Sequence, residues 1–235
     1  MADKTKMYVI LGTAHMATTP GKCSPDHKFR EYQFSRWAVQ AIYDKMKTKG
    51  YNVLIDYMPD NPPSWVASRI AKTEQSRELS MRAKTVNSYC ERYGTSNCIY
   101  ISIHVNAAGA DGKWHNAGGW SAYTSIGRTK SDALAECLYD AAQKHLAGYA
   151  KIVENGKKSG EYSKAQKAIR TETIDCDRDY EYNYYVLANT RCPAVLTENL
   201  FQDTKSDVAF LQSEEGRQAI VNLHVEGIEN YIAKL

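Results

Sequence analysis

The sequence predicts a single α/β domain, with a mostly parallel, twisted sheet of about six strands and helices on both faces. Two observations predict it. Short runs of β-branched and aromatic residues alternate with longer segments whose apolar residues recur at helical spacing. One run, 97–106, is almost continuously apolar, which is typical of a strand buried on both faces. The 235 residues, 43% hydrophobic and 24% charged, are ordinary for one globular domain.

The first half of the chain alternates regularly. The first strand ends in Gly12-Thr-Ala-His15 and is followed by a loop rich in Thr, Pro and Gly. In the next segment, apolar residues spaced three and four apart run from Phe34 to Met46, and Gly50 stops this helical pattern. We expect strands at 7–11, 51–57 and 97–106, and helices at 29–49 and 78–92.

The second half follows the same alternation, with one interruption. The segment 147–181 is charged and poor in aliphatic residues, so we expect an insertion or flap there, with one short helix near Ala165. A final helical region at 206–233 should be broken near 213–216. The remaining expected elements are strands at 118–123, 182–187 and 192–197 and a helix at 130–146. No repeat or second domain is evident, so 1–235 is interpreted as one domain.

Composition excludes several classes of protein. A net charge of +3 with scattered basic residues gives no reason to expect nucleic acid. No apolar run approaches the roughly 20 residues that span a bilayer, so we expect no membrane segment. The N-terminus lacks a signal-peptide pattern, which predicts a protein made without a leader or a mature form from which it was removed. Among six cysteines there is no C-x-x-C pair. Free thiols are expected, although a Cys90–Cys98 or Cys176–Cys192 link stays open.

Four polar residues converge on one edge of the predicted sheet. His15, His104 and Glu198 end separate strands, and Glu31 begins the helix after the first loop. In open α/β sheets, chemistry gathers beyond the carboxyl ends of the strands. Two imidazoles and one carboxylate form a common catalytic zinc set, and a further carboxylate can move the proton of an attacking water. Hydrogen-bonding roles at strand ends, and helix capping by Glu31, are the structural alternatives.

The chain resembles the zinc-dependent N-acetylmuramoyl-L-alanine amidases of the Amidase_3 family, over about residues 8–232. Its most specific matches are Ser102-Ile-His104-Val-Asn106 and Leu196-Thr-Glu198-Asn-Leu-Phe201. The chain departs from the family after the first histidine, where Met16-Ala-Thr-Thr replaces a glycine-rich stretch, and 147–181 matches nothing in the family. Further matching pieces are Gly12-Thr-Ala-His15, Arg30-Glu31-Tyr-Gln33, Arg82-Ala-Lys-Thr-Val-Asn87, Gly118-Gly119, Tyr185-Val-Leu187, Asp207 and Leu211.

The resemblance implies that His15, Glu31 and His104 bind Zn²⁺ and that Glu198 is the general base and acid. The implied substrate is peptidoglycan, cut at the amide that joins N-acetylmuramic acid to L-alanine. Substrate contact or support of the site is expected from Asn106, Arg82 and Asn87; Asn106 could serve either way, whereas Arg82 and Asn87 are expected to brace the site.

Two other functions remain open at this point. A zinc carboxypeptidase acting on peptide stems also uses two histidines and two glutamates, but it needs an H-x-x-E pair, and His15 and Glu31 are sixteen residues apart. A catalytically inactive peptidoglycan-binding protein would be favoured by loss of Glu198 or a metal ligand, and all four residues are present. We expect a monomeric lytic enzyme that acts at the cell wall or periplasm, such as a phage endolysin that stays cytoplasmic until release, or a mature cell-wall amidase.

Overall fold

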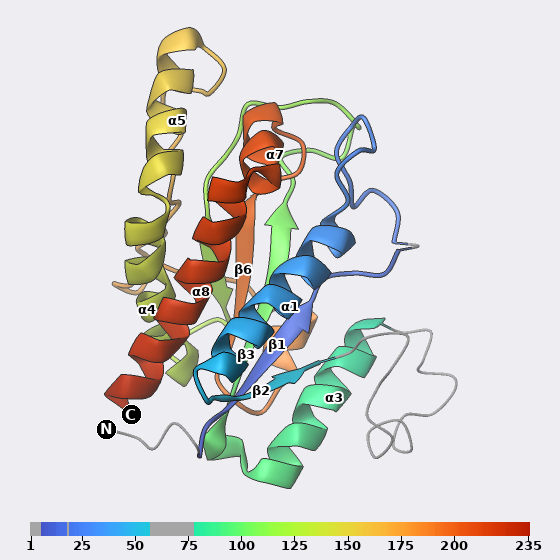
Figure 1. The fold of residues 1–235 in the computed structure, drawn as a ribbon, viewed down its shortest axis with the longest axis vertical. Coiled ribbons are helices and arrows are strands. Elements are labelled where there is room, and N and C mark those ends of the chain that lie inside the picture. The colour runs from blue at the N-terminus through green and yellow to red at the C-terminus, as the bar shows by residue number, and fades with distance from the viewer. Residues whose placement is uncertain (1–5, 18, 57–77) are drawn as a thin grey trace.

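The computed structural model describes residues 6–17, 19–56 and 78–235, and its centre is one six-stranded sheet (Figure 1). The strand order is β2-β1-β3-β6-β4-β5. All neighbouring strands are parallel except β4 and β6, which are antiparallel. The strands are β1 Tyr8–Thr13, β2 Asn52–Ile55, β3 Cys98–Asn106, β4 Ser121–Thr124, β5 Tyr180–Glu181 and β6 Ala194–Phe201. The predicted fold class, a mostly parallel sheet of about six strands, is confirmed.

Helices cover both faces of this sheet (Figure 1). The larger core lies beneath α1, α4 and α8, and the smaller core lies beneath α3 and α6. Strands β1 and β3 contribute alternate residues to the two cores, which explains their nearly unbroken apolar sequence. The helices are α1 Glu31–Thr48, α3 Glu78–Tyr93, α4 Lys130–His145, α5 Ala147–Ser159, α6 Tyr185–Ala188, α7 Lys205–Gln212 and α8 Glu214–Lys234, with a 3₁₀ turn at Thr95–Asn97.

The expected break in the final helical region is confirmed. Helix α7 ends at Gln212 and α8 begins at Glu214. Between them, the Ser213 hydroxyl accepts a hydrogen bond from the Gly216 amide at 3.0 Å and so caps α8. A Cβ at position 216 would collide with the Phe210 carbonyl, so the close approach of the two helices requires glycine here.

The prediction for 147–181 is wrong in its secondary structure. Helix α5 occupies Ala147–Ser159, while the short helix expected near Ala165 is not formed. The inner face of α5 contains only Tyr149, Val153 and Gly156, so its helical periodicity is too sparse to stand out in the sequence. A side chain at Gly156 would overlap the Tyr162 ring, which packs there.

The strand predicted at 182–187 is also wrong. In this part of the chain, the strand β5 ends at Glu181, before the predicted strand begins. Residues Tyr185–Ala188 form the single-turn helix α6. The aromatic residues suggested a strand, but Tyr182 and Tyr185 are exposed, and Tyr182 packs on Tyr184 at 4.6 Å between ring centroids. Tertiary contacts of this kind override strand propensity.

All six cysteines are free, so the predicted free thiols are confirmed and neither of the two open disulfide links is formed. Of the helices in the described ranges, none is both long and apolar enough to cross a membrane. Residue 57, the predicted end of the second strand, lies outside the described residues.

Candidate metal and catalytic site

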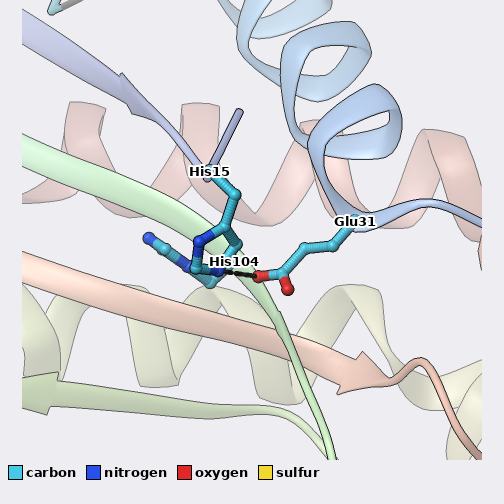
Figure 2. A group of neighbouring side chains, drawn as sticks. All are labelled: His15, Glu31 and His104. Carbon is cyan, nitrogen blue, oxygen red and sulfur yellow. Dashed lines mark hydrogen bonds and ion pairs between the residues drawn. The ribbon is translucent and has the colours of Figure 1, made fainter. Parts of the chain in front are cut away.

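Three side chains from separate elements meet at the carboxyl edge of the sheet (Figure 2). His15 follows β1, Glu31 is the first residue of α1, and His104 lies near the end of β3. Glu31 Oε1 is 3.3 Å from His15 Nε2 and 3.1 Å from His104 Nδ1. The two imidazole rings stand edge to face, with centroids 5.0 Å apart. The structure therefore brings together the three residues that the sequence suggested as metal ligands.

Glu31 is a buried carboxylate whose two oxygens have different surroundings. Its Oε1 accepts a hydrogen bond from the Val105 amide at 3.1 Å in addition to its two histidine contacts. Its Oε2 is buried without a hydrogen-bond partner in the described part of the chain. Burial opposes ionisation, but hydrogen bonds from His104 and His15 outweigh it and hold the pKa of Glu31 well below its ordinary value. Glu31 is therefore a carboxylate with an uncommitted oxygen.

His104 is held in place through its ring and through its main chain. Its Nε2 lies 3.1 Å from the Ser102 hydroxyl, and its main-chain carbonyl accepts a hydrogen bond from the side-chain Nδ2 of Asn199 at 2.9 Å. Burial lowers the pKa of His104, although the charge of Glu31 acts in the opposite direction. A lowered pKa keeps the imidazole neutral, which is the form that binds metal ions.

The backbone at His15 is left-handed, with φ 51°, an uncommon conformation for a residue with a side chain. Arg82 on α3 supports it from behind. Its guanidinium is 2% exposed and donates to the His15 carbonyl at 3.2 Å and to the Thr13 hydroxyl at 2.7 Å. The same group forms a buried ion pair with Asp56 at 3.0 Å.

Two residues that complete this support were not anticipated from the sequence. Asp56 follows β2 and accepts hydrogen bonds from the Thr13 amide and the Tyr100 hydroxyl. Ser35 on α1 accepts from the Ala14 amide at 2.8 Å and donates to the Ile103 carbonyl at 2.6 Å. The position of Asp56 at a strand end was a usable signal, whereas Ser35 carries no sequence signal of this kind.

Glu198 lies on β6 directly across from His104 in the parallel register. Because paired residues of a parallel ladder project to the same face, its side chain belongs to the same edge of the sheet. Its Oε2 is buried without a hydrogen-bond partner among the described residues. Burial, followed by the negative charge of Glu31, raises the pKa of Glu198 well above its ordinary value, while Lys22 opposes the shift. A carboxyl group with a raised pKa holds a proton more readily than an ordinary glutamate, which is a property of groups that transfer protons in catalysis.

The two predicted supporting asparagines lie outside the His15–Glu31–His104 group. The Asn106 Oδ1 accepts from the Ala107 amide at 2.8 Å and tightens the turn after β3. Asn87 on α3 donates to the Asn189 carbonyl at 2.8 Å and accepts from the Arg191 amide at 2.9 Å. Asn87 thus fixes the loop between α6 and β6.

A cavity of about 410 Å³ opens at the same edge of the sheet. Its walls come from the loop after β1, the loop after β3 and the end of β6. Lys22, whose charge acts on Glu198, is one of its residues. The lining residues are Pro20, Gly21, Lys22, Cys23, Ser24, Pro25, His27, Ala107, Gly109, Ala110, Gly112, Lys113, Gln202 and Asp203.

The donor set of the site suits a transition metal ion. Two imidazoles and one carboxylate have ligand atoms within 4.8 Å of one another, and the buried Glu31 Oε2 has a free lone pair. Two histidines and one carboxylate are a common protein ligand set for Zn²⁺. The fold and the site together therefore define an α/β protein with a candidate metal centre at the carboxyl edge of its sheet.

Comparison with known proteins identifies the family. A sequence model described as N-acetylmuramoyl-L-alanine amidase, Amidase_3, matches residues 9–230. The chain therefore belongs to the Amidase_3 family, as its sequence motifs indicated. An endolysin of Bacillus phage SPP1 is 29% identical over 133 residues, which are 55% of this chain and 38% of the endolysin. The chain thus matches well under half the length of that relative.

Solved structures share the fold across the whole chain. The N-acetylmuramoyl-L-alanine amidase of Clostridium difficile 630 superposes with a TM-score of 0.67 at 19% identity, covering 98% of each chain. The amidase Ami1 of Mycobacterium smegmatis gives a TM-score of 0.65 at 16% identity, covering 100% of each chain. At these identities the likeness establishes a common fold.

Proposed function

We propose that this protein is a zinc-dependent amidase that hydrolyses the bond between N-acetylmuramic acid and L-alanine in peptidoglycan. The observation that carries the proposal is the convergence of His15, Glu31 and His104 opposite Glu198, in a chain of the Amidase_3 family. A role as an endolysin or cell-wall lytic enzyme, acting on the wall as a monomer, is part of the same proposal. The resemblance to the phage endolysin supports that part.

The three ligand residues would hold Zn²⁺ through His15, Glu31 and His104. The bound ion supplies Lewis-acid polarisation of the scissile carbonyl and lowers the pKa of a water molecule to about 7. The protein keeps the ligands in place through Arg82 behind His15 and the Val105 amide on Glu31. Such partners of metal ligands fix ligand orientation.

Glu198 would move the proton in the reaction. Its raised pKa and unpartnered Oε2 suit a group that takes a proton from the attacking water and delivers it to the departing alanine nitrogen. The 410 Å³ cavity, which Lys22 helps to line, offers space for part of the substrate at the same edge of the sheet. A carboxypeptidase would cut the peptide stem elsewhere, so the product identifies the reaction.

The decisive experiment is mass spectrometry of peptidoglycan fragments after incubation with the protein, with and without a chelator. The proposal predicts chelator-sensitive release of stem peptides that carry a free N-terminal L-alanine. Shortened stems that remain on the sugar would show a peptidase instead. If several wall types give no products although the protein binds them, an inactive peptidoglycan-binding protein is the better description.

Two substitutions separate the proposed roles. Glu198→Ala should retain zinc and lose activity, whereas His104→Ala should lose both. We expect an activity loss above about 100-fold in each, since even the indirect partners of metal ligands contribute about 10- to 100-fold. His145→Ala, on α4 and paired with Glu226, is the matched histidine control. Equal zinc content in the Glu198 and His104 variants would overturn the assignment of roles.

A further inference from the structure

A second cluster of acidic side chains lies beyond β4, and none of its residues belongs to the His15–Glu31–His104 group or is Glu198. Asp132 belongs to the first turn of α4, and Asp177 and Asp179 belong to the segment that leads into β5. One carboxylate oxygen of each lies within 4.8 Å of the others. The chain in this segment reads Asp175-Cys-Asp177-Arg-Asp179-Tyr-Glu181, with an acidic residue at every second position.

The contacts among these carboxylates extend the cluster beyond the first three. Asp175 interacts electrostatically with both Asp177 and Glu181, and Glu181 Oε1 also accepts a hydrogen bond from the Gly127 amide at 2.9 Å. The backbone is left-handed at Cys176, with φ 76°, and bends through residues 174–179. In extended chain, residues at every second position project to the same face, so this alternation places the acidic side chains on one side of the segment.

Several oxygens of the cluster are buried without a partner. Asp179 is only 1% exposed, and its Oδ1 has no hydrogen-bond partner, while its Oδ2 accepts from the Thr124 hydroxyl at 2.6 Å. Asp177 Oδ1 and Asp175 Oδ2 are likewise buried and unpartnered within the described ranges. Leaving three carboxylate oxygens of neighbouring residues unsatisfied in this way is costly unless something else compensates them.

The protein's own cations do not compensate this charge. In the described ranges, no lysine, arginine or histidine forms an ion pair with any of the five carboxylates. Arg178 lies within the segment but pairs with Glu136 at 2.7 Å and Asp140 at 2.6 Å. Arg128 donates to the main-chain carbonyl of Asp175, at 3.2 Å.

We propose that Asp132, Asp175, Asp177, Asp179 and Glu181 form a binding site for one Ca²⁺ ion. All five offer oxygen only, which selects a hard cation over zinc. Ca²⁺ accepts six to eight oxygen ligands in flexible geometry, whereas Mg²⁺ demands a tight octahedron and keeps several waters. A crowded group of five carboxylates on a bent segment fits the larger ion.

The site would join three parts of the fold. Asp132 also accepts hydrogen bonds from the Thr129 amide and hydroxyl, so it caps α4, and its remaining lone pairs are available to a cation. Asp179 is bonded to the end of β4 through Thr124, and Glu181 lies in the edge strand β5. A bound Ca²⁺ would therefore fasten the two-residue strand β5 to β4 and α4 and stabilise the folded state.

Calcium binding can be tested on the zinc-supplemented protein after removal of other divalent ions. Isothermal titration with CaCl₂ should show one site, and thermal unfolding should show a Tm several degrees higher in saturating Ca²⁺ than without it. Asp177→Asn, at a half-buried position, should weaken calcium affinity at least tenfold and abolish most of the Tm shift. Its calcium-free Tm should equal or exceed that of the wild type, because one like charge is removed.

Two controls and one further site variant fix the location of the site. Asp140→Asn removes a carboxylate of α4 that binds Arg178 outside the cluster, and it should keep the full calcium response. His104→Ala should also keep the calcium response, which would show that calcium does not bind at the proposed zinc site. Asp179→Asn should lose it; if that buried variant fails to fold, Asp177→Asn decides. A wild-type protein without calcium-induced heat and Tm shift, an unchanged response in Asp177→Asn, or tighter binding of Mg²⁺ than of Ca²⁺ would overturn the proposal.

Discussion

Glu31 and Asp179 are both carboxylates with 1% of their surface exposed, but their neighbours differ. Burial disfavours the charge of Glu31, yet hydrogen bonds from His104 and His15 hold its pKa well below the ordinary value. Burial raises the pKa of Asp179 to about 7, and Asp177 and Asp132 add to the rise against a hydrogen bond from Thr124. Burial alone therefore does not decide ionisation; the donors that the fold supplies do.

The same comparison explains which cation each site would need. Glu31 already has two imidazoles within hydrogen-bond distance, and their nitrogens select a transition metal. Asp179 has other carboxylates as neighbours, so in the proposed site a cation from solution would supply the positive charge. Asp56 is a third case, since its positive partner is Arg82 of the same chain.

The largest effect on stability is expected at Asp56. In Asp56→Ala, the guanidinium of Arg82 would stay buried at 2% exposure without its main counter-charge. Breaking a buried ion pair from one side costs about 3–5 kcal/mol, and urea unfolding at pH 7 measures it. Asp44→Ala, at an exposed position on α1, is the control and should change stability by less than about 0.5 kcal/mol. A loss below about 1 kcal/mol in Asp56→Ala would show that the ion pair with Arg82 contributes little to stability.

His224 on α8 tests a buried base that has only neutral partners. Its ring contacts the Thr197 hydroxyl at 2.9 Å and the Ile220 carbonyl at 2.8 Å, and burial lowers its pKa to about 4. The unfolded chain takes up this proton near pH 6.5, whereas the folded chain does so only near pH 4. The contribution of neutral His224 to the free energy of unfolding is therefore fully present above pH 6.5. It is lost as the pH drops toward 4, by up to about 3 kcal/mol.

The measurement is the free energy of unfolding at pH 7 and pH 4.5 in the wild type and in His224→Gln. Since glutamine does not titrate, the variant should lose less stability on acidification than the wild type. Carboxylates contribute equally to both proteins, so the difference isolates His224. Identical losses would mean that the imidazole is protonated in the folded protein at a higher pH than its burial implies.

Neutralising Glu31 should lower stability, whereas neutralising Asp179 should not. In metal-free protein, Glu31→Gln weakens charge-assisted contacts with two histidines and should cost about 2–3 kcal/mol. Asp179→Asn removes a charge repelled by Asp177 and Asp132, and should leave stability unchanged or raise it. Urea unfolding of both variants without divalent ions measures the two effects. Losses of equal size would show that the two carboxylates are not as different as their surroundings suggest.

Much of this fold could be predicted from the sequence because its central strands and long helices have strong periodicity. The continuous apolar run at β3 and the spacing in α1 each leave one strong interpretation. Helix α5 was missed because only three of its residues are buried, and α6 because tyrosines that pack on one another imitate a strand. Both errors lie where tertiary contacts, not local pattern, determine the structure.

The residues of the site also differ in how far the sequence could predict them. His15, His104 and Glu198 were found because strand ends in an α/β sheet converge, and sequence order indicates where strands end. Ser35 and Asn199 help to orient them but were not found, since hydrogen bonds across 21 and 95 residues have no local signature. Asp56 was missed although its position at a strand end was a usable signal. The acidic alternation at 175–181 was visible in the sequence, but only the fold shows that Asp132 joins it.

The smallest loss of stability is expected at Ser35, which links the segments that carry the two histidines through main-chain hydrogen bonds. Its buried hydroxyl joins the Ala14 amide to the Ile103 carbonyl, the residues directly before His15 and His104. Ser35→Ala leaves both backbone groups without this partner and should cost about 1–2 kcal/mol in urea unfolding. Ser96→Ala, at an exposed position, is the control. If the link positions the ligands, Ser35→Ala should also weaken zinc affinity about tenfold in a chelator competition. A loss of stability with unchanged zinc affinity would mean that Arg82 and the Val105 amide suffice to hold the ligands.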